Sequence, residues 1–132
     1  KISVAIATDD GLYPATVPGV EAMSPADIAS AVAALAEKAK TGKLAKEDIS
    51  GGSFTVSNLG MFGVTNFTAI INPPMGAILA LGKGEQKVVV KDGAPAVATV
   101  ISASLSCDHR VIDGAIGAQF LQVLGEEIAA LG

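Results

Sequence analysis

The 132-residue sequence contains one cysteine, one histidine, one tyrosine and no tryptophan. Because Cys107 is the only cysteine, a disulfide within the sequence is excluded. This cysteine content is compatible with a reducing compartment. Nine lysine and arginine residues are spread thinly over a sequence of net charge −4, so a nucleic-acid-binding surface is not expected. No apolar run approaches the roughly 20 residues that cross a bilayer. The longest, residues 77–81, predicts a buried strand instead.

Apolar residues, in contrast, are abundant. They make up 50% of the sequence, and the mean hydropathy is +0.52. We interpret this excess as surface buried against other subunits, the alternative being that many small side chains face inward. The length suits one domain or a large piece of one. Because the sequence opens directly in a strand-like pattern at Lys1, without an initiator methionine, we expect a fragment.

The first half predicts a strand, a turn and a helix. Ile2–Thr8 alternates between apolar and small or polar residues, as a half-buried strand does. Asp-Asp-Gly at 9–11 turns the chain, and the two prolines in residues 14–19 predict an extended loop. A capping serine, Ser24, followed by Pro25 and Asp27, predicts a helix start, and Gly42 a helix end.

The second half predicts further strands and a closing helix. Residues 53–57, 87–91 and 96–107 have strand-like patterns, and Asp92-Gly93 is typical of a hairpin turn. After Gly114, apolar residues recur at helical spacing to the end. The sum is an α/β domain with a mixed, largely buried sheet and two substantial helices.

The only histidine, His109, follows the last predicted strand. Loops at strand ends are where rigid scaffolds present reactive groups, and a side chain of pKa near ~6.5 is well suited to accept a proton. A lone histidine is more often structural, but the flanking charges Asp108, Arg110 and Asp113 favour a catalytic role. Asp113 has a second interpretation as the cap of the last helix, and Arg110 has one as the ion-pair partner of either aspartate.

Other chemistry has weaker support. Cys107 lies two residues before His109 and is a candidate nucleophile, yet it continues the apolar face of its strand, where cysteine usually fills space. Gly-Met-Phe-Gly at 60–63 and Gly-Lys-Gly at 82–84 complete no phosphate-binding motif and are interpreted as turns. One histidine and one cysteine supply no metal-ligand spacing.

The residues around His109 resemble a known family signature. Asp-His-Arg-Val-Ile-Asp-Gly at 108–114 is similar to the His-x-x-x-Asp-Gly signature of dihydrolipoamide acyltransferases and the related chloramphenicol acetyltransferases. Gly-Gly-Ser-Phe-Thr-Val-Ser-Asn-Leu-Gly-Met-Phe-Gly at 51–63, Phe-Thr-Ala-Ile-Ile-Asn-Pro-Pro at 67–74 and Gly-Lys-Gly-Glu-Gln at 82–86 resemble family segments in the same order. Ser-Asn-Leu-Gly-Met-Phe-Gly at 57–63, followed by the run at 67–74, is most similar to acetyl-transferring members of pyruvate dehydrogenase complexes.

The resemblance implies a fold and three site residues. The fold is α/β, a chloramphenicol acetyltransferase-like mixed sheet flanked by helices, with residues 1–132 forming the C-terminal part of the catalytic (core) domain and its N-terminal part missing. His109 deprotonates the attacking thiol, Ser57 donates a hydrogen bond to the tetrahedral oxyanion, and Asp113 helps to hold the geometry. A thiol of pKa near ~8.5 needs such a base at neutral pH, and one oxyanion donor is worth roughly 3 kcal/mol.

The resemblance also implies substrates and partners. The lipoyl group is carried on a separate domain, coenzyme A is a substrate, and no metal is needed because one thioester is exchanged for another. The site lies between subunits of a trimer, with His109 and Ser57 from different chains, and trimers build a hollow cubic or dodecahedral core. Pyruvate dehydrogenase and dihydrolipoyl dehydrogenase are the expected partners, in the mitochondrial matrix or, alternatively, the bacterial cytoplasm.

Two alternatives stay open. One is an inactive structural or partner-binding core component, whose mark would be loss of His109 or Ser57, and both are present. The other is a succinyl or branched-chain acyltransferase. Residues 11–20 depart from the usual family run, so no functional role is assigned there.

Overall fold

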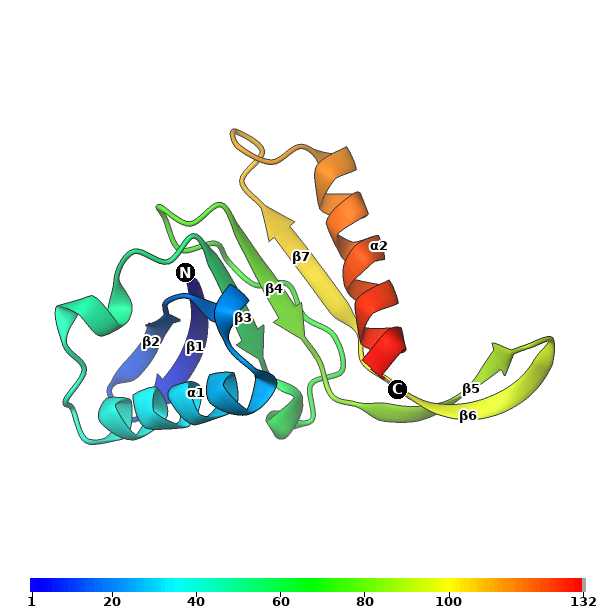
Figure 1. Cartoon of the computed structure of the whole chain (residues 1–132), viewed down its shortest axis with the longest axis horizontal. Helices are drawn as coiled ribbons and strands as arrows, with labels where there is room; N and C mark the ends of the chain where they lie inside the picture. The colour runs from blue at the N-terminus through cyan, green and yellow to red at the C-terminus, as the bar shows by residue number, and fades with distance from the viewer. Residues whose placement is uncertain (132) are drawn as a thin grey trace.

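A computed structural model describes residues 1–131 as two β-sheets and two long helices (Figure 1). The strands are β1 (Ile2–Thr8), β2 (Gly11–Val17), β3 (Phe54–Asn58), β4 (Ala77–Leu81), β5 (Glu85–Lys91), β6 (Ala94–Val100) and β7 (Ala103–Cys107), and the helices are α1 (Pro25–Lys40) and α2 (Gly114–Leu131). Short 3-10 turns lie at Val20–Ala22, Lys46–Ile49 and Gly60–Phe62. This is the α/β class with a mixed sheet that the sequence predicts.

The main sheet has the strand order β2-β1-β3-β4-β7. Strands β1, β3 and β4 run parallel, and the two edge strands, β2 and β7, run antiparallel to their neighbours. Four of the five residues of β4 are buried, as expected for a central strand, whereas β3 and β7 are mainly half-buried. Both helices lie on one face of this sheet: α1 across β1 and β2, and α2 along β7 (Figure 1).

Helix α1 forms because its start is strongly specified. Ser24 Oγ accepts a hydrogen bond from the Asp27 amide at 3.2 Å, and the Asp27 carboxylate accepts one from the Ser24 amide at 3.3 Å, which completes the predicted capping box. The apolar stripe of the helix then packs on β2, where Leu35 joins Ala15 and Val17 in a buried cluster. This cluster anchors the β1–β2 hairpin to the helix.

Helix α2 covers the opposite edge of the same face. The rings of Phe54 on β3 and Phe120 on α2 lie with their centroids 5.4 Å apart. Gly117, the buried residue of α2, faces Cys107 so closely that a Cβ built on it would lie 3.3 Å from the sulfur. The absence of a side chain at Gly117 therefore lets α2 approach the end of β7, next to the loop that carries His109.

The connection from β3 to β4 is an extended segment rather than a helix. Residues 64–72, which we call the strap, lie over the sheet face that the helices leave open. Ser104 Oγ donates to the Asn66 side-chain oxygen at 3.0 Å, and Ser106 Oγ donates to the Ala69 carbonyl at 2.9 Å. The predicted serine face of the last strand is thus used to bind the strap.

The hairpin of β5 and β6 projects away from the rest of the chain (Figure 1). Its turn is the predicted Asp92-Gly93 pair, with φ of 52° and 78°, the left-handed values that a type I′ turn requires. Val88, Val90 and Val97 on this hairpin are exposed. Within residues 1–131, no helix is both long and apolar enough to cross a membrane.

Two predictions about local structure were wrong. The segment 14–19 was expected to be a loop, yet Pro14 belongs to β2, because β2 is an edge strand and an edge tolerates a residue without an amide hydrogen. Residues 96–107 were expected to form one strand, but the chain breaks at Ile101 and Ser102. The first part pairs with β5 and the second with β4, so a single apolar pattern spans two sheets.

Candidate active site

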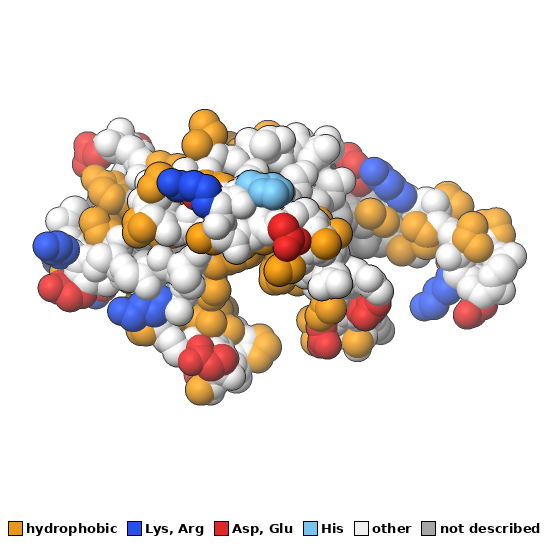
Figure 2. Space-filling view, turned by 90° about the horizontal axis from the view of Figure 1, so that it is seen from above, with side chains coloured by type: hydrophobic (Ala, Val, Ile, Leu, Met, Phe, Trp, Pro, Cys, Tyr) orange, Lys and Arg blue, Asp and Glu red, His pale blue; other side chains and the backbone are white. Residues whose placement is uncertain are grey.

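His109 lies in the turn that follows β7, at the surface (Figure 2). The Asp108 amide donates to the Gly76 carbonyl at 2.8 Å, and the Asp108 carbonyl accepts from the Val111 and Ile112 amides, each at 3.0 Å. The first bond ties the start of the turn to the residue before β4, and the other two close the turn on itself. The imidazole makes no hydrogen bond to any of residues 1–131, so it is free to bind a substrate.

A charged pair flanks the histidine. Arg110 Nε lies 2.9 Å from Asp108 Oδ1, and Arg110 Nη2 lies 2.6 Å from Asp108 Oδ2. The Arg110 guanidinium lowers the pKa of the Asp108 carboxyl to about 2, and the same contact raises the pKa of Arg110. Sequence reasoning left the partner of Arg110 open between two aspartates, and the structure assigns it to Asp108.

Asp113 begins helix α2. Its carboxylate Oδ1 accepts the Ile116 amide at 2.9 Å, and its carbonyl accepts the Gly117 amide at 3.1 Å. This is an N-cap, the second of the two roles considered from sequence. No hydrogen bond links Asp113 to His109 among the described residues, and the observed part of Asp113 is to fix where the loop ends and the helix begins.

Ser57 lies near the C-terminal end of β3, beside a split in the sheet. Only Ile2–Val4 of β1 pair with β3, so the two strands diverge beyond that point (Figure 1). A cavity of about 330 Å³ occupies the split; Ser57, Leu59 and the 3-10 turn residues Met61 and Phe62 contribute to its lining. The Ser57 hydroxyl makes no hydrogen bond to residues 1–131, which leaves it available as a donor.

Sequence reasoning did not identify this cavity. Met61 and Phe62 are 73% and 70% exposed, although apolar side chains of that size are normally covered. The sequence did contain a signal for an apolar surface here, because two large apolar residues lie between glycines in a turn shortly after Ser57. The strand divergence that creates the cavity, however, depends on pairing between residues about 50 positions apart.

Within one chain, Ser57 and His109 do not meet. The register aligns Ser57 with Ala80 and Ala80 with Ser104, whereas Cys107 aligns with Ala77 at the other end of β4. Three residues of strand separate these two rows, about 10 Å at 3.3 Å per residue, and His109 lies further out still. The two predicted site residues therefore belong to opposite ends of the sheet.

Cys107 and metal chemistry find no structural support within the described residues 1–131. The Cys107 sulfur faces Gly117 of α2 and makes no hydrogen bond to His109. Since a nucleophilic cysteine needs its base within hydrogen-bonding reach, this geometry favours the space-filling role that the sequence already suggested for Cys107. In the same residues, no group of three or more His, Cys, Asp or Glu side chains is arranged to hold a metal ion.

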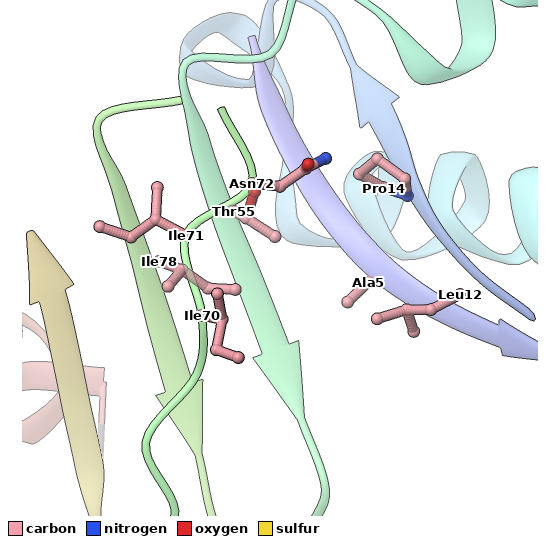
Figure 3. Close-up of a pocket in the computed structure, with 8 residues that line it drawn as sticks. All are labelled: Ala5, Leu12, Pro14, Thr55, Ile70, Ile71, Asn72 and Ile78. Carbon is pink, nitrogen blue, oxygen red and sulfur yellow. The ribbon is translucent and has the colours of Figure 1, made fainter. Parts of the chain in front are cut away.

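A second apolar cavity, of about 310 Å³, opens between the strap and the β1–β2 hairpin (Figure 3). Ile70, Ile71 and Asn72 of the strap and Thr55 and Ile78 of the central strands contribute to its lining. It shares Ala5 and Leu12 with the cavity at Ser57, so the two are neighbours. His109 borders neither, and this second cavity therefore has no direct link to the predicted base.

Comparison with known proteins identifies the relatives. Residues 1–131 match the family model of the 2-oxoacid dehydrogenases acyltransferase (catalytic domain). The chain is 48% identical over 124 residues to the mitochondrial dihydrolipoyllysine-residue acetyltransferase component of pyruvate dehydrogenase complex from Dictyostelium discoideum, covering 92% of this chain and 20% of that protein. The corresponding component from Rickettsia bellii is 43% identical over 120 residues, with 91% and 29% covered.

Solved structures agree with the observed fold. Dihydrolipoamide acetyltransferase from Azotobacter vinelandii, a structure concerned with the role of a serine, a histidine and an asparagine in catalysis, superposes with a TM-score of 0.94 at 40% identity, covering 98% of this chain and 54% of that one. The cubic core of the pyruvate dehydrogenase multienzyme complex gives 0.90 at 40% identity, with 95% and 51% covered. The chain thus spans about half of these structures and less than a third of the two curated relatives. It belongs to the family of the 2-oxoacid dehydrogenases acyltransferase catalytic domain.

Proposed function

We propose that the intact protein transfers an acetyl group between dihydrolipoamide and coenzyme A, with His109 as general base and Ser57 as oxyanion donor. One observation carries this assignment. The serine, histidine and asparagine studied in the Azotobacter enzyme are separated by 52 and then 4 residues. Ser57, His109 and Asp113 have the same separations here.

The geometry suits the chemistry that these residues would perform. His109 is exposed on a loop whose backbone is fixed by hydrogen bonds. Its imidazole makes no hydrogen bond to any of residues 1–131. It takes the proton of the attacking thiol, the thiolate adds to the thioester carbonyl, and the Ser57 hydroxyl stabilises the resulting oxyanion. When the tetrahedral intermediate collapses, the leaving thiolate receives the proton back from His109. No proton or electron is left over, so the exchange needs no metal.

Asp113 stands at the position where the Azotobacter enzyme has its asparagine. We propose that its part in the reaction is positional. It caps α2, and thereby fixes the C-terminal end of the loop that carries His109.

The complete site is proposed to form between subunits. A base and an oxyanion donor must both lie near one carbonyl carbon, yet Ser57 and His109 lie at opposite ends of the sheet. A neighbouring copy that brings its Ser57 to this His109 resolves the contradiction, and a cyclic trimer repeats the contact three times. Exposed apolar residues and the cubic core formed by a relative support this assembly.

The substrates and partners follow from the same proposal. The lipoyl group would arrive on a separate domain, with coenzyme A as the second substrate. Pyruvate dehydrogenase and dihydrolipoyl dehydrogenase would be the partner enzymes, since the relatives are components of pyruvate dehydrogenase complexes. Relatives occur in mitochondria and in bacteria, and we propose the mitochondrial matrix, with the bacterial cytoplasm as the alternative.

The decisive experiment replaces His109 by alanine in the full-length protein. We expect acetyl transfer from acetyl-coenzyme A to dihydrolipoamide to fall by about 10²–10⁴-fold, the usual contribution of a positioned base. Particle size, measured by light scattering, should not change, because the imidazole makes no hydrogen bond within the described residues. An unchanged rate would contradict the assignment. Parallel assays with succinyl and isobutyryl donors test the proposed acetyl specificity. A higher transfer rate with either of these donors would contradict it.

A further inference from the structure

The turn that carries His109 is spanned by the charged pair on either side of it. The Asp108 carboxylate receives Arg110 Nε at 2.9 Å and Nη2 at 2.6 Å, one on each oxygen. Two parallel bonds between planar groups fix the relative orientation of both side chains. Because the partners are residues i and i+2, the residue between them is His109, and its backbone is held within a closed ring.

The same carboxylate also binds the backbone of the turn. Asp108 Oδ1 accepts the Arg110 amide at 3.0 Å, in addition to the guanidinium. The Asp108 amide in turn donates to the Gly76 carbonyl at 2.8 Å, which ties the ring to the start of β4. There is little room beneath it: a Cβ on Gly76 would lie 3.3 Å from Val111. The histidine is thus fixed relative to the sheet by Asp108.

A contribution to global stability accounts for only a small part of what this ion pair does. The Arg110 side chain is 84% exposed and that of Asp108 is 23% exposed. Exposed ion pairs usually contribute little to the free energy of folding, because water screens them and ordering the side chains costs entropy. A pair of this kind has its main effect on the local geometry that it fixes, and here that geometry belongs to His109.

We infer that Asp108 and Arg110 are positioning residues for His109. The inference rests on the proposed function, in which His109 is the base. The pair has two effects on the imidazole. It holds the turn in one conformation, and its two opposite charges cancel, so that the pair places no net charge beside the imidazole.

The rate test uses Asp108→Asn and Arg110→Gln in the full-length protein. Asparagine keeps an oxygen for the Arg110 amide but loses the ion pair, and glutamine loses the guanidinium fork. Both should lower kcat by about tenfold to a hundredfold with KM nearly unchanged, because a displacement of ~1 Å at a catalytic group costs rates of that order.

The pH test separates charge from position. Asp108→Asn leaves Arg110 as an unbalanced cation, which disfavours the imidazolium. The acidic limb, that is, the acidic side of the pH profile of kcat/KM, should therefore move to lower pH. Arg110→Gln leaves an unbalanced anion and moves that limb to higher pH. The double variant should return the limb to the wild-type position while kcat stays low. A residue with a purely structural role would not produce these opposite shifts.

Few other ionisable groups contribute near His109. Asp113 is the remaining one in the loop, and its carboxylate is engaged by the Ile116 amide. On the neighbouring strands, β7 carries only the thiol of Cys107, and β4 carries none. Residues 72–76 and residues 114–125 of α2 have no ionisable side chain either. The two limb shifts are therefore assigned to the flanking pair.

A matched control exists elsewhere in the chain. Lys38 and Asp48 form another exposed ion pair, with Nζ and Oδ1 3.1 Å apart, near the C-terminal end of α1. Asp48→Asn breaks this pair and should change neither kcat nor the pH limb. The inference is overturned if all three variants of the pair, Asp108→Asn, Arg110→Gln and the double variant, keep the wild-type kcat and the wild-type pH profile of kcat/KM, while His109→Ala is inactive. If His109→Ala itself is active, the proposed function fails instead.

Discussion

Two aspartates of one loop, Asp108 and Asp113, have different tasks although they lie five residues apart. Asp108 binds a side chain, Arg110, and holds the turn. Asp113 binds backbone amides and starts a helix. The sequence suggested the second task, because an aspartate followed by glycine before an apolar periodic run is typical of an N-cap. The partner of Arg110 could not be predicted, since the turn that brings Asp108 within reach is tied by a hydrogen bond to Gly76, which is distant in the sequence.

The cap at Asp113 makes a prediction for stability. Asp113→Ala removes the acceptor of the Ile116 amide and should lower the free energy of unfolding by about 1 kcal/mol, the usual cost of a lost N-cap. Asp113→Asn keeps an acceptor oxygen and should stay close to the wild type, in line with the asparagine of the Azotobacter enzyme at the same separation. Urea unfolding of both variants measures this. Equal losses in the two would contradict a capping role.

The Asp108 carboxyl predicts a dependence of stability on pH. Its pKa in the folded chain is about 2, below the ordinary value of 3.8, because Arg110 stabilises the charged form. A lowered folded pKa contributes stability that is present above the unfolded pKa and lost as the pH falls toward the folded one. The difference in unfolding free energy between wild type and Asp108→Asn should therefore be constant above about pH 5 and shrink between about pH 4 and pH 2. A difference that grows on acidification, in urea titrations at these pH values, would contradict it.

Among the elements, the strap lies close against the backbone that follows β4. A Cβ built on Gly82, just after β4, would collide with the Thr65 carbonyl oxygen. Nearby, the Lys83 amide donates to the Val64 carbonyl at 2.7 Å. The obstacle is backbone and not a flexible side chain, so the strap itself must move if Gly82 acquires a side chain.

Gly82→Ala should therefore destabilise the chain by about 1–3 kcal/mol, the range for overpacking against a rigid neighbour. Gly125→Ala on α2 is the control. Nothing lies within 4 Å of a Cβ at Gly125, and alanine in a helix interior should stabilise by about 0.5–1 kcal/mol. Urea denaturation of the two variants should show opposite signs. A neutral Gly82→Ala would mean that the strap does not hold its position.

The elements that sequence predicted well are those whose ends are locally specified. Helix α1 has its capping box, β1 has its alternation, and the β5–β6 turn has Asp92-Gly93. The failures have non-local causes. Pro14 fits a strand only because β2 lies at a sheet edge, and the break at Ile101 appears only when the pairing partners of β6 and β7 are known. The strap was likewise not predictable, because its hydrogen bonds join residues 37 or 38 positions apart.

For the whole molecule, the central observation is that the two groups of the proposed site lie apart within the described chain. One group is the imidazole of His109 on its fixed turn. The other is the hydroxyl of Ser57 beside an apolar cavity with Met61 and Phe62 at its rim. Sequence resemblance predicted both residues and their origin in different chains. The strand register supports the proposal of an inter-subunit site, because it keeps the two residues at opposite ends of one sheet.

Mixing of two inactive full-length proteins tests this arrangement directly. In Ser57→Ala every His109 is intact, and in His109→Ala every Ser57 is intact, so neither protein alone has a complete site. If the site joins two subunits in a ring, trimers assembled from an equal mixture contain some junctions with both residues, about a quarter of the total for random cyclic assembly. Co-expression should then restore about a quarter of the wild-type acetyl transfer. If instead each chain built its own site, no mixture would be active, and the inter-subunit proposal would be abandoned, because no chain in the mixture carries both groups.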